Sequence, residues 1–329
     1  MTGTRAGSDA ASLLKAVRDR DPLAIARAIT AIENRTAVGT ELAVAVRGRA
    51  SRCRTLGVTG PPGAGKSSLI NALLPELLPR YRRVAILTVD PSSPISGGAV
   101  LGDRVRMAAH SANPDVFIRS LAARGHLGGV TRTTRSVMDL LAAADMDLVI
   151  VETVGTGQSE VEVANLTDVK IVVCAPGLGD EMQAMKAGVL EIADLLVVNK
   201  ADLPDAARTA THLKAMLHHR GHEERRSMLS VSTQTRDGLK ALGDAIDDRF
   251  AGLPAGPPDA AAGGGISRST LAQDVADAAA ALLLGTSDPR LTTIVEHMSQ
   301  GKLSRHEGAK AALELLTDLD APSEARIYS

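Results

Sequence analysis

The sequence contains very few aromatic residues, with two Phe, two Tyr and no Trp among 329 residues. Aromatic side chains are the usual stacking platforms for single-stranded nucleic acid, and Lys plus Arg (37) nearly equal Asp plus Glu (38), so we expect no nucleic-acid partner. No run reaches the roughly 18 apolar residues that cross a bilayer, and residues 1–12 lack the order of a signal peptide. Cys53 and Cys174 stand far apart, which is typical of buried thiols in a reducing compartment. We therefore expect a cytoplasmic protein without a membrane partner.

Short apolar runs separated by helical stretches follow one another from Arg54 onward. Such runs, rich in β-branched residues, predict strands buried on both faces and hence a mostly parallel sheet flanked by helices, an α/β fold. The expected strands are Thr55–Thr59, Val84–Val89, Leu148–Val151, Val169–Cys174, Leu195–Val198 and Met228–Val231.

Helical segments are expected on both sides of this core. Apolar spacing predicts helices over residues 9–50, and the Gly-, Pro- and Ala-rich sequence after Phe250 predicts a connector. Beyond it, the segments Leu271–Leu284 and Arg290–Leu316 have the pattern of amphipathic helices. The predicted organisation is an N-terminal helical extension (1–50), a core (51–250), a linker (251–266) and a C-terminal helical arm (267–329).

The segment from Gly60 to Ser67, GPPGAGKS, matches GxxxxGK[ST] and lies between an expected strand and an expected helix over Ser67–Leu78. That context is the one in which backbone amides cradle phosphates, Lys66 reaches the β- and γ-phosphates, and the Ser67 hydroxyl binds Mg²⁺. The expected fold is therefore a P-loop NTPase. Candidate nucleotide contacts here are Gly60, Pro61, Pro62, Gly63, Ala64, Gly65, Lys66, Ser67 and Ser68.

A second motif, Asn199-Lys200-Ala201-Asp202, follows the expected strand Leu195–Val198, at the sheet edge where ligands of open α/β folds bind. An NKxD in this place can read guanine, because Asp202 accepts hydrogen bonds from N1 and N2 that adenine does not offer. The Lys200 stem would cover the base. The cofactors predicted are therefore GTP or GDP with Mg²⁺.

Two acidic residues end expected strands between these motifs. Asp90 follows Val84–Val89, and Glu152 opens the sequence Glu152-Thr-Val-Gly155, an ExxG that can contact Mg²⁺ through water while the Gly155 amide meets the γ-phosphate. Two Gly-rich segments, Pro91–Asp103 and Leu121–Thr131, are expected to be loops that order on nucleotide binding, or ordinary surface loops. Four histidines, His212, His218, His219 and His222, leave open a metal-binding alternative.

The linear order of GPPGAGKSS, DPSSPISGGAVLGDRVRM, LGGVTRTTR, ETVGTGQSE, PGLGDEMQAMKAG and NKAD closely resembles the MeaB/ArgK family of GTPases over about Arg54–Phe250. The resemblance implies that Ser67, Asp90, Asp103 and Glu152 interact with Mg²⁺. It implies a third switch across Gly177–Lys186, in which Asp180, Glu181, Gln183 and Lys186 are candidates, although these residues also fit a capped, solvated helix start. It also implies a homodimer formed partly by the C-terminal helices. The candidate loop at the base is Val231-Ser232-Thr233.

We expect from these motifs a Mg²⁺-dependent GTP hydrolase that chaperones an adenosylcobalamin-dependent acyl-CoA mutase by gating cofactor loading or protection. Candidate catalytic residues are Lys66, Glu152 and Gln158, the last by its position near that of a water-orienting glutamine. Two alternatives remain, a metal-insertion GTPase and a transport-associated ATPase or kinase.

Overall fold

The structure is a computed structural model that describes residues 3–91, 110, 113–123, 127–153, 166–177, 192–218, 227–253, 275, 279, 283, 286 and 288–319. The chain divides into two compact units, residues 1–259 and 260–329. None of the helices in these described ranges is long and apolar enough to cross a membrane.

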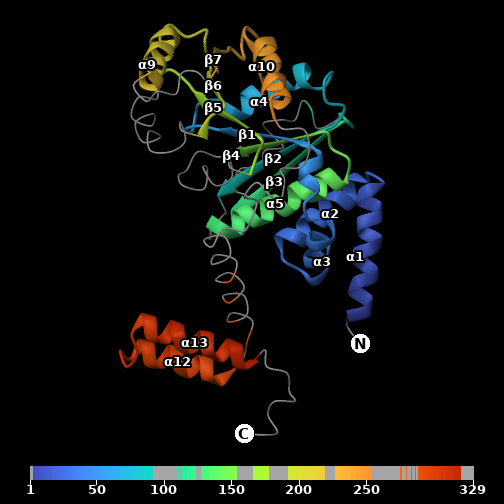
Figure 1. Ribbon diagram of the computed structural model, residues 1–329, viewed down its shortest axis with the longest axis vertical. Helices are drawn as coiled ribbons and strands as arrows, with labels where there is room; N and C mark the ends of the chain where they lie inside the picture. The colour runs from blue at the N-terminus through green and yellow to red at the C-terminus, as the bar shows by residue number, and fades with distance from the viewer. Residues whose placement is uncertain are drawn as a thin grey trace. The chain divides into compact units, whose positions relative to one another are not determined.

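A seven-stranded parallel sheet forms the centre of the first unit (Figure 1). Its strands are β1 (Arg54–Thr59), β2 (Val84–Pro91), β3 (Val116–Ala123), β4 (Leu148–Thr153), β5 (Val169–Cys174), β6 (Leu195–Val198) and β7 (Ser227–Ser230). Their order is β3-β2-β4-β1-β5-β6-β7, so the strands that follow β1 lie on both sides of it. The carboxyl end of β1 is therefore a topological switch point, the place where open α/β sheets bind ligands.

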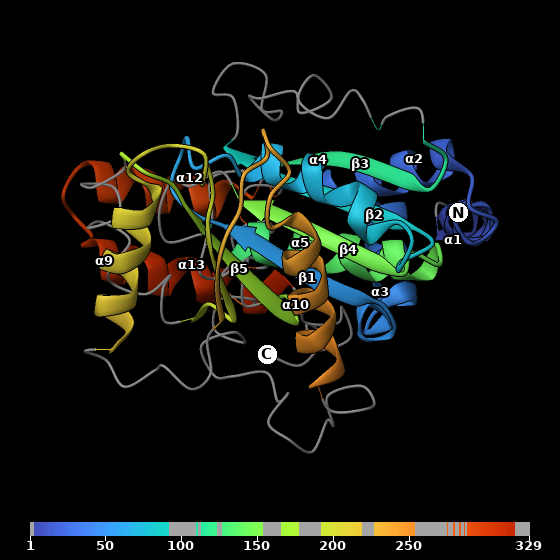
Figure 2. The ribbon, with the colours of Figure 1, turned by 90° about the horizontal axis from the view of Figure 1, so that it is seen from above.

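Helices cover both faces of this sheet (Figures 1 and 2). On one face, α4 (Lys66–Leu77) and α10 (Leu239–Ala251) pack on the aliphatic side chains of β1, β2, β4, β5 and β6. On the other, α5 (Leu127–Ala143) packs under β2 and β4, together with α1 (Gly3–Arg18), α2 (Pro22–Glu33), α3 (Ala37–Val46) and the short η1 (Arg49–Arg52). Helix α9 (Ala206–His218) packs against β5 and β6.

The predicted α/β class and all six predicted strands are confirmed, but one strand was missed. Strand β3 and helix α5 occupy much of the segment Leu121–Thr131, so the expectation of a loop there is wrong outside residues 124–126, which are not described. The glycines at the start of α5 suggested a loop, yet the buried residues of its later turns fix it as a helix. Strands β2 and β4 also run further than expected, so that Asp90 and Glu152 lie within strands.

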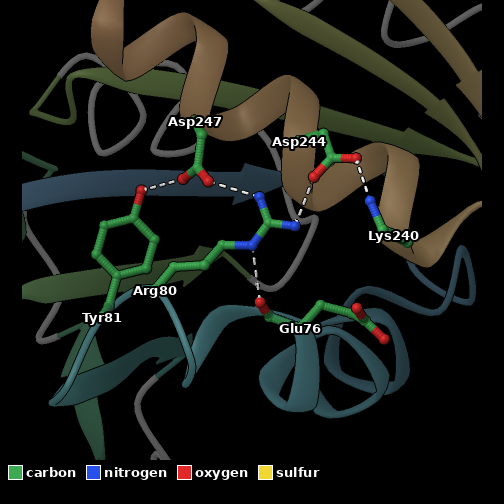
Figure 3. A network of polar contacts seen from close by, with 6 residues as sticks. All are labelled: Glu76, Arg80, Tyr81, Lys240, Asp244 and Asp247. Atoms are coloured by element: carbon green, nitrogen blue, oxygen red, sulfur yellow. Dashed lines mark hydrogen bonds and ion pairs between the residues drawn. The ribbon is translucent and has the colours of Figure 1, made fainter.

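A polar network joins the end of α4 to α10 (Figure 3). The Arg80 guanidinium donates to Asp247 (2.5 Å) and to Asp244 (2.6 Å), and the Tyr81 hydroxyl donates to Asp247 (2.5 Å). Hydrogen bonds from Lys240 and Arg80 lower the pKa of Asp244. The network fixes α4, which carries the P-loop residues Lys66 and Ser67, against the helix that follows the candidate base loop.

The described part of the second unit contains a pair of helices, α12 (Pro289–Ser299) and α13 (Arg305–Leu319). The chain turns between them at Gly301, whose φ is +70°. Within the pair, Met298 packs closely on Gly308: a Cβ added to Gly308 would lie 2.2 Å from the Met298 sulfur. The predicted helix Leu271–Leu284 lies almost entirely outside the described residues, and the predicted domain boundaries remain predictions.

Candidate functional site

The chain between β1 and α4 forms a tight loop whose backbone favours glycine at three positions. Gly60, Gly63 and Gly65 have φ values of +146°, +75° and +87°, a region that disfavours side chains. A Cβ on Gly60 would lie 2.2 Å from the Val173 carbonyl oxygen, and one on Gly65 would lie 2.5 Å from Nδ2 of Asn199. The loop is thus packed against β5 and against the NKAD segment, and the start of α4 directs its backbone amides out of the sheet edge.

Lys66 opens α4 and folds back over the loop. Its Nζ donates to the carbonyl oxygens of Gly60 (2.6 Å) and Pro61 (3.0 Å), and the residue is buried. The positive charge is therefore held against the inside of the loop, where phosphate oxygens would replace these carbonyls as acceptors.

Ser67 and Glu152 meet next to this lysine. The Ser67 hydroxyl donates to Oε1 of Glu152 at 2.6 Å, and Glu152 is only 5% exposed. A hydroxyl and a buried carboxylate at a helix N-terminus are hard oxygen donors of the kind that Mg²⁺ prefers. This pair therefore fits the predicted cation.

The NKAD segment is attached directly to the phosphate-binding loop. Asn199 Nδ2 donates to the Ala64 carbonyl oxygen (2.9 Å), and Lys200 Nζ donates to that of Gly63 (2.9 Å). Lys200 has a positive φ of +58°, which turns the chain sharply after β6. Asn199 is 1% exposed, and its Oδ1 has no hydrogen-bond partner among the described residues.

The loop after β7 holds the carboxylate of the same motif. The Ser232 hydroxyl donates to Oδ1 of Asp202 at 2.5 Å, and Ser232 Oγ accepts from the amides of Gln234 (3.2 Å) and Thr235 (3.1 Å). Ser232 is buried while Asp202 is exposed, and Thr233 lies in the same loop. The arrangement presents the Asp202 carboxylate at the sheet edge in a fixed orientation.

Seven predicted site residues lie outside the described residues: Asp103, Gly155, Gln158, Asp180, Glu181, Gln183 and Lys186. The backbone of Asp90 lies in β2, but its side chain is not described. The structure therefore brings together Lys66, Ser67, Glu152 and the P-loop with Asn199, Lys200, Asp202 and Ser232. Pro62 and Ser68 lie exposed in this segment.

Neither a metal cluster nor a reactive thiol occurs in the described ranges. No three His, Cys, Asp or Glu side chains gather there in a way that could hold a metal ion, although His219 and His222 lie beyond those ranges. Burial raises the pKa of Cys174 to about 12, and burial with the nearby charge of Asp168 raises that of Cys53 to about 12. Both thiols are therefore protonated at neutral pH.

Sequence reasoning missed two hydroxyl pairs near the carboxyl edge of the sheet. Thr88 donates to Ser120 (3.0 Å) between β2 and β3, and Thr153 donates to Thr59 (2.9 Å) at the ends of β4 and β1. In the sequence, each pair is visible only as a Thr or Ser within a strand segment. Ordinary strands also contain such residues, so the sequence does not predict the pairs.

A family sequence model and individual relatives both relate this chain to GTPases. A sequence model of the family described as methylmalonyl Co-A mutase-associated GTPase MeaB matches residues 25–256. A putative GTPase of Pyrococcus abyssi (strain GE5 / Orsay) is 43% identical over 205 residues, which cover 62% of this chain and 63% of that protein. A probable GTPase of Mycobacterium tuberculosis (strain ATCC 25618 / H37Rv) is 42% identical over 245 residues, which cover 71% and 73%.

A solved structure also matches the fold. The crystal structure of a LAO/AO transport system kinase has a TM-score of 0.62 and 27% identity, and the match covers 94% of this chain and 98% of that one. The chain spans less than two thirds of the length of the Pyrococcus relative, so only part of that protein is matched.

Proposed function

Because this chain belongs to the MeaB family of methylmalonyl-CoA mutase-associated GTPases, we propose that it hydrolyses GTP and uses the nucleotide state to chaperone an adenosylcobalamin-dependent acyl-CoA mutase. One observation supports the proposal most strongly. Asn199 and Lys200 donate hydrogen bonds to the P-loop carbonyls of Ala64 and Gly63. The phosphate-binding and base-reading motifs therefore form one site.

The proposed reaction is attack of water on the γ-phosphate. Lys66 and the amides at the start of α4 would hold the negative charge that develops on the phosphate oxygens. Ser67 and Glu152 would hold Mg²⁺, with Asp90 and Asp103 as further candidates. When bound, Mg²⁺ neutralises charge on the β- and γ-phosphate oxygens. Gln158 is the proposed residue that orients the water, and the Gly155 amide is proposed to meet the γ-phosphate.

Base selection is assigned to Asp202. Its Oδ1 already accepts from Ser232, which fixes the plane of the carboxylate so that it can accept the N1 and N2 protons of guanine. Lys200, held to Gly63, would lie along one face of the base.

The link to the mutase is proposed to run through the segment Gly177–Lys186, which follows β5 at the nucleotide edge. Substitution of Lys186 or Gln183 by Ala should leave intrinsic GTP hydrolysis within about threefold but remove most of the stimulation by the partner, because a partner shifts a switch only through contacts that differ between its states. The measurement is phosphate release with and without methylmalonyl-CoA mutase loaded with adenosylcobalamin.

Two results would contradict this role for the segment. Loss of intrinsic and stimulated turnover together would place Lys186 and Gln183 in the basic catalytic site. Unchanged stimulation in both variants would show that the segment is no switch. Lys214→Ala, on the exposed surface of α9, is the control and should change neither rate.

The C-terminal helices are proposed to take part in a homodimer. Val295 on α12 and Leu313 on α13 are 55% and 50% exposed, and a pair of helices with so small an apolar core gains stability by covering such side chains.

A second candidate function is an ATP-dependent kinase of a transport system, which the description of the matched crystal structure favours. It requires selectivity for ATP and transfer of phosphate to a protein. The pairing of Asp202 with Ser232 supports guanine instead, and nucleotide selectivity separates the two functions.

A further inference from the structure

On β4, β2 and β3, the sheet face that α4 covers changes from aliphatic to polar at a single row of residues. Residues in register on adjacent parallel strands point to the same face, so three rows can be followed from β4 through β2 to β3. The rows are Leu148–Val84–Val116, then Ile150–Ile86–Ile118, then Glu152–Thr88–Ser120. Oxygen-bearing side chains thus begin at the row that contains Glu152.

Thr88 is the central member of this polar row. It is 1% exposed, and its hydroxyl donates to Ser120 Oγ at 3.0 Å. It is paired in register with Glu152, whose carboxylate accepts from Ser67. Valine has the same shape as threonine and would pack equally well here, as the aliphatic rows below show. Burying a hydroxyl is unfavourable unless it is hydrogen-bonded, so a threonine in place of valine at this position indicates a polar role.

The hydrogen bond to Ser120 sets the polarity of the Thr88 oxygen. A Thr88 hydroxyl that donates to Ser120 keeps two lone pairs, with which its oxygen can accept a further hydrogen bond. Water molecules bound to a cation have only protons to offer, so this oxygen has the complementary polarity.

We propose that Thr88, held by Ser120, is a positioning residue for the divalent cation of the nucleotide site, where its oxygen accepts a hydrogen bond from a cation-bound water beside Glu152. This inference rests on the proposed function. Residues that orient the ligands and waters of a metal in this way typically change its affinity about 10- to 100-fold when they are removed.

The test compares Thr88→Val, which keeps the shape and removes the oxygen, with Thr88→Ser, which restores the oxygen. Mn²⁺ binding to the full chain with GDP is measured by electron paramagnetic resonance, and GDP binding is measured in EDTA. We expect Thr88→Val to weaken Mn²⁺ binding about 10- to 100-fold and to leave GDP binding in EDTA unchanged. Thr88→Ser should bind Mn²⁺ nearly as wild type does.

The matched control is Thr153→Val. Thr153 forms the second hydroxyl pair near this sheet edge, with Thr59, and is itself buried. Its side chain faces the opposite side of the sheet from Glu152 because the two residues are adjacent in β4. Removal of the Thr153 hydroxyl should lower the melting temperature about as much as Thr88→Val does, without weakening Mn²⁺ binding.

Three outcomes would overturn the inference. Unchanged Mn²⁺ affinity in Thr88→Val would do so, as would an equal loss in Thr153→Val. Failure of Thr88→Ser to restore the affinity would assign the effect to packing. A wild-type chain that binds no guanine nucleotide would instead overturn the proposed function, and with it this inference.

Discussion

At the scale of single residues, Asn199 joins the two halves of the site. It donates to the P-loop through Nδ2, and Gly65 lacks the Cβ that would collide with that nitrogen. The sequence predicted both motifs and their order along the chain. It did not predict that one asparagine would connect them, since that contact depends on β1 and β6 being arranged around β5.

Asp202→Asn should exchange guanine for xanthine selectivity. The amide oxygen of Asn can still accept from Ser232, so the loop should keep its structure. The amide nitrogen is a donor in place of the second carboxylate oxygen, which accepts a guanine proton, and this donor matches the carbonyl group of xanthine. We expect GDP affinity to fall by about 100-fold or more and XDP affinity to rise, as measured by competition with a fluorescent GDP analogue.

Asp205→Asn provides the control for this exchange, because Asp205 is an exposed carboxylate three residues further on. It should bind GDP as the parent does. Retention of full GDP affinity by Asp202→Asn would show that the base is read elsewhere.

At the scale of elements, the interior strands of the sheet and the edge strand β7 could be predicted from the sequence, but the other edge strand, β3, could not. Strands β4, β5 and β6 contain the apolar runs Leu148–Val151, Ile171–Cys174 and Leu195–Val198, and β1 is buried from Thr55 to Thr59. In β3, Phe117, Ile118, Arg119 and Ser120 are only partly buried, and Arg119 instead binds Glu33 of α2 at 2.9 Å. An edge strand such as β3 contains polar residues among its apolar ones, and some of them bind neighbouring helices. Its sequence therefore lacks the continuous apolar run that identifies a buried strand.

The packing of α2 on α3 depends on Gly39. A Cβ at this position would lie 2.0 Å from the backbone carbonyl oxygen of Ala31, which cannot move without separating the helices. Gly39→Ala gains about 1 kcal/mol of helix propensity, but the collision should cost more, typically 1–3 kcal/mol or above. We expect net destabilisation, measured as a lower urea midpoint of unfolding.

Gly252→Ala is the matched substitution without a collision. Gly252 has a φ of −77°, and a Cβ there would lie 3.5 Å from its nearest neighbour, an ordinary contact. Its unfolding midpoint should stay close to that of wild type. A Gly39→Ala variant as stable as wild type would show that α2 and α3 do not pack closely enough at this position for a Cβ to collide with Ala31.

At the scale of the whole molecule, the order of the strands explains why motifs far apart in the sequence form one site. Parallel strands place all their carboxyl ends at one edge, and β1, β4 and β6 deliver the P-loop, Glu152 and the NKAD segment there. The class of sheet followed from the composition of the runs, because parallel strands covered by helices on both faces are typically apolar on both faces. The second unit was less predictable, since its short amphipathic helices have few buried residues to define their packing.

The most direct test of the central claim is nucleotide selectivity together with turnover. Binding of GTP and ATP and release of phosphate from each are measured with Mg²⁺ for the wild type, for Lys66→Ala and for the control Lys214→Ala on the exposed surface of α9. We predict GTP affinity exceeding that for ATP by about 100-fold or more, turnover of GTP, and near-complete loss of turnover in Lys66→Ala alone. Equal affinity for ATP and GTP, or hydrolysis by Lys66→Ala at the wild-type rate, would contradict the account.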